Sequence, residues 1–291
     1  MKPAFCVIDI GSNSVRLMLG TERDGRAVSL KKTLCTTRLA AGLNETHLLR
    51  EDRMEASIRA IERFSDTAAE YGIPVLAYAT SAVRDAGNRE AFLDTVKHRT
   101  GIDVLVLSGA EEGKLAFAAV MGGTGTVFDI GGGSFQVVTS ENALSFPCGC
   151  VRAKDRCDAS DPQTLERELF RWMDENARLP ETVPTPVYGV GGTISSIGAL
   201  LAGQQTFDIA GLSDITLQTL DDLIRRLCAV PERERLQHPL LHERGDVILQ
   251  GAMILRYLMV RTHTDTVRPS VRDGMEGIAE ALLLHKGSAH L

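Results

Sequence analysis

Several features that would assign a role directly are missing from this sequence. It contains no apolar run of about 18 residues and no signal-peptide pattern, so we expect no membrane partner and a cytoplasmic location. No block of Lys or Arg occurs and the formal net charge is −6, so we expect no nucleic-acid partner. The GxxxxGK[ST] pattern of P-loop enzymes is also absent, which excludes that class.

Cysteine and aromatic side chains are few. The 291 residues include six cysteines, one Trp and 5% aromatic residues in all. The cysteines follow no zinc-site or disulfide-framework spacing, and only Cys148 and Cys150 lie close together, so we expect free thiols. His238 and His242 are spaced by four, but Pro239 disrupts a helix there, which argues against a metal pair.

Strand and helix patterns alternate along both halves of the chain. Apolar runs predict strands at 5–10, 14–20, 27–39, 75–80, 103–107, 126–130, 134–140 and 186–191. Amphipathic patterns predict helices at 51–71, 88–99, 111–121, 163–178, 193–202, 216–228, 244–262 and 274–285. This alternation is typical of the α/β class. Because the glycine-rich stretch 122–125 is the most flexible break, we predict domains at 1–121 and 122–291, with the C-terminal helix able to pack back onto the first.

The strongest signal is an internal repeat. Residues 7–19 (VIDIGSNSVRLML) and 127–138 (VFDIGGGSFQVV) share an apolar pair, Asp-Ile-Gly, two small residues, Ser and a strand pattern. Each copy predicts a strand, a tight turn and a returning strand; ordinary hairpin turns are the alternative to a functional role. Such turns expose backbone N–H groups to phosphate, and the leading Asp9 or Asp129 can hold a magnesium ion. Two facing copies would make a cleft for a phosphorylated ligand.

A third glycine element occupies residues 188–200 (YGVGGTISSIGAL). It predicts a strand, a turn at Gly191 and Gly192, and a helix whose first N–H groups can bind an anion. Ile194 occupies the third small position of the dinucleotide fingerprint, so a dinucleotide site is excluded.

Together these motifs resemble the exopolyphosphatase and guanosine-pentaphosphate phosphatase family, part of the actin-like superfamily. The resemblance runs from Phe5 to about Leu284 and includes these segments: DIGSNSVRL at 9–17, ATSAVRDAGN at 79–88, LSGAEEGKLAF at 107–117, DIGGGS at 129–134, GVGGT at 189–193 and RGDVILQGAMIL at 244–255. It implies an α/β protein of two duplicated actin-like (ribonuclease H-like) domains with the active site in the cleft between them.

The resemblance also implies a reaction, in which an activated water removes the terminal phosphate of inorganic polyphosphate with Mg²⁺ as cofactor. In that reaction Glu112 would deprotonate the water, and Arg84 would hold the transferring phosphoryl group. Asp9 and Asp129 would ligate the metal. The implied substrate-binding residues are Gly11, Ser12, Asn13, Ser14, Gly131, Gly132, Gly133, Ser134, Gly191 and Gly192.

Alternatives remain for the substrate and for catalysis. The same chemistry could act on a phosphorylated guanine nucleotide, guanosine pentaphosphate. Alternatively, the protein could be a non-catalytic sensor that binds polyphosphate or a nucleotide. Family members usually carry Thr-Glu after GGGS, where this chain has Phe135 and Gln136. Longer members add a helical C-terminal domain, so we expect a preference for short polyphosphates or a nucleotide. The oligomeric state stays open, a homodimer included.

Alternatives also remain for individual side chains. Glu111 and Glu112 are both placed to cap the first turn of their helix, where acids are favoured by the dipole. Arg84 precedes Asp85 and could form a surface ion pair with it. Arg16 alternates with apolar neighbours on its strand, so the sequence leaves open whether it faces the cleft or solvent.

Overall fold

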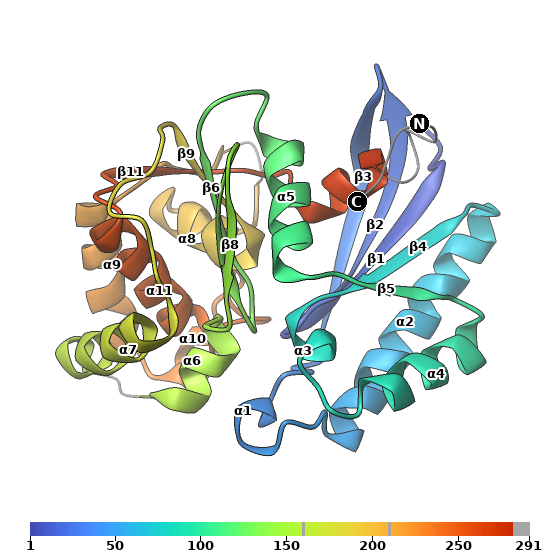
Figure 1. Ribbon diagram of the computed structural model, residues 1–291, viewed down its shortest axis with the longest axis horizontal. Coiled ribbons are helices and arrows are strands. Elements are labelled where there is room, and N and C mark those ends of the chain that lie inside the picture. The colour runs from blue at the N-terminus through green and yellow to red at the C-terminus, as the bar shows by residue number, and fades with distance from the viewer. Residues whose placement is uncertain (159–160, 209–210, 282–291) are drawn as a thin grey trace. The chain divides into compact units, whose positions relative to one another are not determined.

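The computed structural model describes residues 1–158, 161–208 and 211–281 and divides the chain into two compact units (Figure 1). Unit 1 contains residues 1–119 together with the segment that starts at Arg272, and unit 2 contains residues 120–271. The sequence prediction placed the boundary at 121/122 and allowed the C-terminal helix to pack back onto the first domain. In the structure the chain passes from unit 1 to unit 2 at 119/120 and returns to unit 1 at Arg272.

Unit 1 is built on a five-stranded sheet in the order β3-β2-β1-β4-β5. β1 (Phe5–Ile10), β2 (Ser14–Arg23) and β3 (Arg26–Thr36) are antiparallel neighbours, whereas β4 (Val75–Ala79) pairs parallel to β1 and β5 (Val104–Val106) parallel to β4. All of β1 is buried, as its continuous apolar run predicts for a central strand.

Helices cover the sheet of unit 1. α2 (Glu51–Tyr71) and α4 (Arg89–Thr100) pack against each other, and α2 contacts β1 and β2. The short helix α12 (Gly274–Ala279) contacts β1 and β3. Its apolar side chains join a core that also includes β1 and α5 (Gly109–Val120); this core contains Phe5, Val7, Met18, Tyr78, Leu115, Met275 and Ile278. The C-terminal segment therefore belongs to unit 1 because it completes this core.

Unit 2 is built on a six-stranded sheet in the order β10-β11-β9-β6-β7-β8. β6 (Thr126–Ile130), β7 (Phe135–Thr139) and β8 (Ala143–Phe146) are antiparallel. β9 (Val187–Val190) and β11 (Thr266–Pro269) continue the sheet in parallel, and β10 (Ile215–Thr216) pairs antiparallel at the edge. The described residues of this unit include the helices α6 (Cys150–Arg156), α7 (Pro162–Asn176), α8 (Gly191–Leu201), α9 (Leu217–Ala229), α10 (Glu232–Arg235) and α11 (Ile248–Arg261).

The two sheets have the same topology. In both units an antiparallel meander of three strands is continued by two parallel strands on the other side of the central strand, and unit 2 adds β10. Asp9 pairs with Arg16 across the first meander, and Asp129 pairs with Gln136 across the second. The predicted α/β class and the duplication of a ribonuclease H-like domain are therefore confirmed. None of the helices in the described part of the chain has the length and apolar character needed to span a bilayer.

Most predicted elements are present, with some differences. Strands 5–10 and 126–130 and helix 51–71 have the predicted bounds. The helix predicted at 244–262 begins only at Ile248, because the preceding residues form turns. Of the predicted helix 274–285, residues 282–285 lie outside the described residues. The elements that were not predicted are short: α1 (Leu43–Thr46), α3 (Ser81–Arg84), β8, α6, β10, α10 (Glu232–Arg235) and β11.

Candidate active site

The turn between β1 and β2 is closed and largely buried. Gly11 N donates to the Ser14 carbonyl at 3.1 Å, and the Asn13 carbonyl accepts two backbone N–H groups from the chain beyond β3. Ser12, Asn13 and Ser14 are buried. Ser12 Oγ and Asn13 Oδ1 have no hydrogen-bond partner among the described residues. Leaving such atoms unsatisfied costs about 1–3 kcal/mol each, a cost that a polar ligand bound at this loop would remove.

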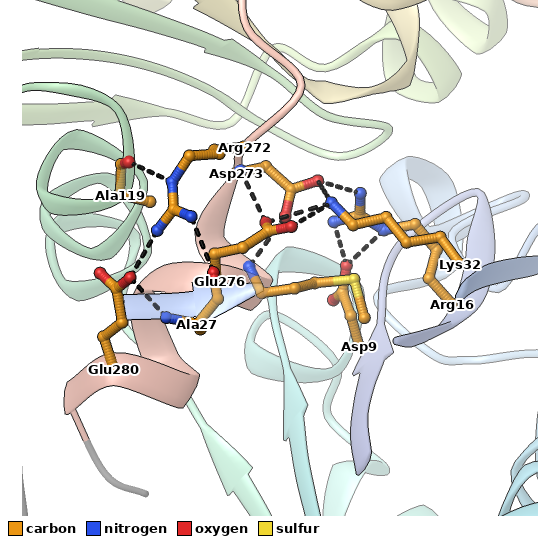
Figure 2. Close-up of polar contacts among 10 residues, drawn as sticks. Asp9, Arg16, Ala27, Lys32, Ala119, Arg272, Asp273, Glu276 and Glu280 are labelled. Carbon is orange, nitrogen blue, oxygen red and sulfur yellow. Dashed lines mark hydrogen bonds and ion pairs between the residues drawn. The ribbon is translucent and has the colours of Figure 1, made fainter. Parts of the chain in front are cut away.

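Asp9 is held by Arg16, which lies opposite it on β2. Arg16 Nε donates to Asp9 Oδ2 at 2.7 Å, and Nη2 binds the same oxygen. Arg16 Nη1 donates to Asp273 Oδ2 at 2.7 Å, so the guanidinium lies between two carboxylates (Figure 2). Asp9 Oδ1 is buried and has no hydrogen-bond partner in the described part of the chain. Burial raises the pKa of Asp9, and the Arg16 charge acts against this effect.

Asp273 and Glu276 bring two further acidic side chains to this group. They form a capping box at the start of α12: Asp273 Oδ1 accepts from Met275 N at 2.8 Å, and Glu276 Oε2 accepts from Asp273 N at 3.0 Å. Lys32 Nζ lies 2.8 Å from Glu276 Oε1 and 3.7 Å from Asp273 Oδ2 (Figure 2). Burial acts to raise the pKa of Asp273, but Arg16 and Lys32 outweigh it and hold that pKa below its usual range.

Arg84 and Glu112 lie together in unit 1. Arg84 Nη1 is 3.6 Å from Glu112 Oε2 and donates to the Leu107 carbonyl at 3.0 Å, while Nε lies 3.3 Å from Asp85 Oδ1. The side chains of Arg84 and Glu112 are only 21% and 17% exposed. The predicted surface pairing of Arg84 with Asp85 therefore exists, but the same guanidinium also faces Glu112.

The two adjacent acids at the start of α5 have different surroundings. Glu111 Oε2 accepts from Ser108 N at 2.7 Å, and Glu111 N donates to Ser108 Oγ at 3.2 Å, so this pair caps the helix. The Ser108 hydrogen bond lowers the pKa of Glu111. Glu112 Oε2 lies 3.6 Å from Arg84 Nη1. The two adjacent acids therefore contact different groups, Ser108 for Glu111 and Arg84 for Glu112.

Tyr78 connects the Asp9 group with the Arg84–Glu112 pair. It lies opposite Asp9 in the parallel β1–β4 ladder and is 3% exposed. Burial raises the pKa of its hydroxyl well above the usual value, and the charges of Asp9, Asp273 and Glu112 act in the same direction. Unit 1 therefore places a neutral tyrosine within electrostatic reach of Asp9, Asp273 and Glu112.

The second loop, in unit 2, repeats the geometry of the first. Gly131 N donates to the Ser134 carbonyl at 3.0 Å. The segment after β8 packs onto this loop: Cys150 N donates to the Gly131 carbonyl at 3.0 Å and Val151 N to that of Gly132 at 2.8 Å. A Cβ at Gly149 would overlap backbone atoms of Gly132 and Ser134, so only glycine permits this approach. The Cys148–Cys150 segment thus holds the loop in place, and all six cysteines are free, as predicted.

Gln136 supports the same loop from β7. It is 1% exposed, and its Nε2 donates to Ser134 Oγ at 3.0 Å and to Ser145 Oγ at 3.3 Å. An amide at this position donates to Ser134, so the hydroxyl hydrogen of Ser134 can be directed to another acceptor. The departure from Thr-Glu at Phe135 and Gln136 therefore changes the hydrogen bonding of the loop.

The glycine turn before α8 brings two charged side chains close to bare backbone. Gly191 has a φ of +89°, and a Cβ there would lie 3.2 Å from Asp129 Oδ1. A Cβ at Gly192 would overlap the guanidinium of Arg244, which therefore rests against this turn. Sequence reasoning placed Arg244 in a family segment but gave it no role. Its distance from the glycine motif along the chain concealed the contact.

The donors at these positions suit a hard cation. Asp9 offers a buried carboxylate oxygen without a hydrogen-bond partner among the described residues, and Asp129 carries its carboxylate at the equivalent end of β6. The described residues contain no cluster of three or more His, Cys, Asp or Glu side chains placed to hold a metal. Mg²⁺ commonly binds through one or two carboxylates, with water and substrate phosphates completing its shell, so each of these carboxylates is of a kind that Mg²⁺ binds.

Comparisons with known proteins agree on one family. The profile of the Ppx/GppA phosphatase family matches residues 21–285. Exopolyphosphatase 2 of Mycobacterium tuberculosis is 30% identical over 311 residues, which cover 94% of this chain and 97% of that protein. The crystal structure of the Aquifex aeolicus Ppx/GppA family member is 26% identical, covers 98% and 99% of the two chains and superposes with a TM-score of 0.80. An exopolyphosphatase from Cytophaga hutchinsonii, 24% identical over 96% of this chain and 97% of that one, shares the fold with a TM-score of 0.84.

Proposed function

Because this chain belongs to the Ppx/GppA phosphatase family, we propose that it is an exopolyphosphatase that removes the terminal phosphate of inorganic polyphosphate with Mg²⁺ as cofactor. The observation that carries the proposal is the placement of Glu112 beside Arg84, with Glu111 assigned to the helix cap. The name of the M. tuberculosis relative, which matches over nearly its whole length, supports polyphosphate as the substrate.

In the proposed reaction, water attacks the terminal phosphorus and the bond to the bridging oxygen breaks. The products are inorganic phosphate and a chain shortened by one unit. A carboxylate oxygen of Glu112 accepts the proton of the attacking water, and Arg84 donates N–H groups to the transferring phosphoryl group. Arg84 Nη1 lies 3.6 Å from Glu112 Oε2, so the proposed base lies beside the side chain that would bind the phosphoryl group.

Two loops and a glycine turn supply the phosphate-binding groups of the proposal. The backbone N–H groups of residues 11–14 in unit 1 and 131–134 in unit 2 would bind phosphate oxygens. The turn at Gly191 and Gly192 would do the same at the start of α8, where Arg244 adds a positive charge. When bound, Mg²⁺ would offset negative charge on the phosphates and the leaving group; Asp9 and Asp129 are its proposed protein ligands.

Two neighbouring glutamates provide the test. Phosphate release is measured with Mg²⁺ from polyphosphate of defined length and, in parallel, from guanosine pentaphosphate. Glu112→Gln should lower kcat by about 10²–10⁴-fold, the usual contribution of a general base. Glu111→Gln is the matched control, because Gln can replace Glu in a capping box, and it should retain activity within about twofold.

The outcomes separate the three candidate functions. Release from polyphosphate that is lost in Glu112→Gln supports the proposal. Release from guanosine pentaphosphate alone identifies the nucleotide phosphatase instead. Binding of polyphosphate by a wild-type chain that releases nothing from either substrate identifies a sensor. Equal loss of activity in Glu111→Gln and Glu112→Gln would refute the assignment of the base.

A further inference from the structure

We infer that Asp273, carried by the segment that returns to unit 1, is a positioning residue for Asp9. By binding one N–H group of Arg16, it keeps an oxygen of Asp9 available to a divalent cation. The inference rests on the proposed function only in taking Asp9 as a cation ligand. It concerns a residue that sequence reasoning did not identify, 257 positions from Arg16 along the chain.

The hydrogen bonds of Arg16 leave one oxygen of Asp9 uncovered. An arginine commonly binds a carboxylate with two parallel N–H groups, one on each oxygen. Here Nε and Nη2 both bind Oδ2 of Asp9, while Nη1 is directed to Asp273. Oδ1 of Asp9 is left without a hydrogen-bond partner in the described part of the chain. The second carboxylate therefore fixes the guanidinium in an orientation that covers only one oxygen of Asp9 (Figure 2).

The charged side chains around Asp9 do not balance. Two cations, Arg16 and Lys32, contact three carboxylates, those of Asp9, Asp273 and Glu276. The group thus has one negative charge in excess when all its members are ionised, and this excess favours a cation. Without the charge of Asp273, the group would contain two cations and two carboxylates. Asp9 would then be the only carboxylate paired with the charge of Arg16. Both effects weaken the attraction of Asp9 for a metal ion.

Independent contacts anchor the segment that carries Asp273. Arg272 Nε donates to the Ala119 carbonyl at 2.7 Å and Nη1 to the Ala27 carbonyl at 2.8 Å. Glu280 Oε1 accepts from Ala27 N at 2.9 Å (Figure 2). The same oxygen accepts from Arg26 Nε at 2.9 Å. None of these contacts involves Asp273, so its charge can be removed while the segment keeps its attachment.

The test is Asp273→Asn in the full chain. Asn caps helices as well as Asp does, so this variant can keep the hydrogen bond to Met275 N. It removes the charge and, because its NH₂ group cannot accept, the hydrogen bond from Arg16 Nη1. Mn²⁺ binding is measured by electron paramagnetic resonance without substrate, and Mg²⁺ binding by competition. Asp273→Asn should raise both Kd values about tenfold, as expected for the loss of one nearby charge. The Mg²⁺ concentration for half-maximal phosphate release should rise by the same factor, with kcat at saturating Mg²⁺ little changed.

Glu280→Gln is the matched control. It alters a carboxylate of the same segment that binds Arg272 rather than Arg16, so it should lower stability and leave the Kd for Mn²⁺ within about twofold. Equal Mn²⁺ affinity in wild type and Asp273→Asn would overturn the inference, and so would equal weakening in both variants. Hydrolysis of polyphosphate by a wild-type chain that binds no Mn²⁺ would also overturn it while leaving the phosphatase function intact.

Discussion

At Gly277, α12 approaches the backbone of α5 closely, and a substitution there would test this contact. A Cβ at this position would overlap the carbonyl oxygen of Leu115, lie 2.7 Å from its carbonyl carbon and lie 3.1 Å from its Cα. These atoms belong to the backbone of α5 and cannot rotate away, so one helix must shift. Gly274 is in the same helix, but a Cβ there would meet nothing closer than the Tyr78 hydroxyl at 3.7 Å, an ordinary contact.

The two substitutions should therefore differ in the sign of their effect. Gly→Ala within a helix favours folding by about 1 kcal/mol. Overpacking a core costs about 1–3 kcal/mol, and a clash with backbone belongs at the upper end of that range. Gly277→Ala should lower the free energy of unfolding by about 2 kcal/mol net. Gly274→Ala, at the first helical position, should be neutral or raise it by a few tenths of a kcal/mol.

Urea unfolding followed by circular dichroism measures both variants, with the slope of the transition used to check that cooperativity is unchanged. Amide hydrogen exchange in residues 274–281 reports whether the loss is local to the segment. If Gly277→Ala is as stable as Gly274→Ala, the close approach of α12 to α5 is refuted.

Two further predictions concern the second loop and the thiols. Gln136→Ala would remove the N–H donor to Ser134 Oγ, so KM for polyphosphate should rise by up to about tenfold in steady-state assays; an unchanged KM would contradict the role given to Gln136. Burial raises the pKa of Cys6 and Cys148 to about 12 and that of Cys150 to about 11. At pH 8 a disulfide reagent should therefore react with Cys35, Cys157 and Cys228 first and with these three thiols only when the protein unfolds. Prompt reaction of all six thiols would contradict the burial of the three.

Local patterns were enough to predict the features that depend on neighbours in sequence. The two hairpin loops were predicted because Asp-Ile-Gly and the small residues after it specify a strand and a tight turn within a few positions. Helix 51–71 was predicted at its observed bounds, since its apolar side chains have helical spacing. The Ser108–Glu111 spacing is also a local capping-box signature, and it assigns Glu111 to the start of the helix from the sequence alone.

Features that depend on distant contacts were not predicted. The position of Arg16 is decided by Asp273, and the contact of Arg244 with Gly192 joins two separate segments. No periodicity or spacing encodes such pairs. The sequence allowed the C-terminal helix to pack back onto the first domain but did not identify its partners, which are residues of the unit 1 core such as Val7 and Leu115.

The return of the chain at Arg272 has a consequence for the order in which the protein is made. Unit 2 is one continuous stretch, 120–271, whereas unit 1 requires residues from both ends of the chain. During synthesis, β1 and β2 leave the ribosome before unit 2, whereas Asp273 and the apolar side chains of α12 follow it. Unit 2 can therefore complete its sheet while unit 1 still exposes apolar surface, so a core whose strands are made before unit 2 closes only after unit 2 has been made.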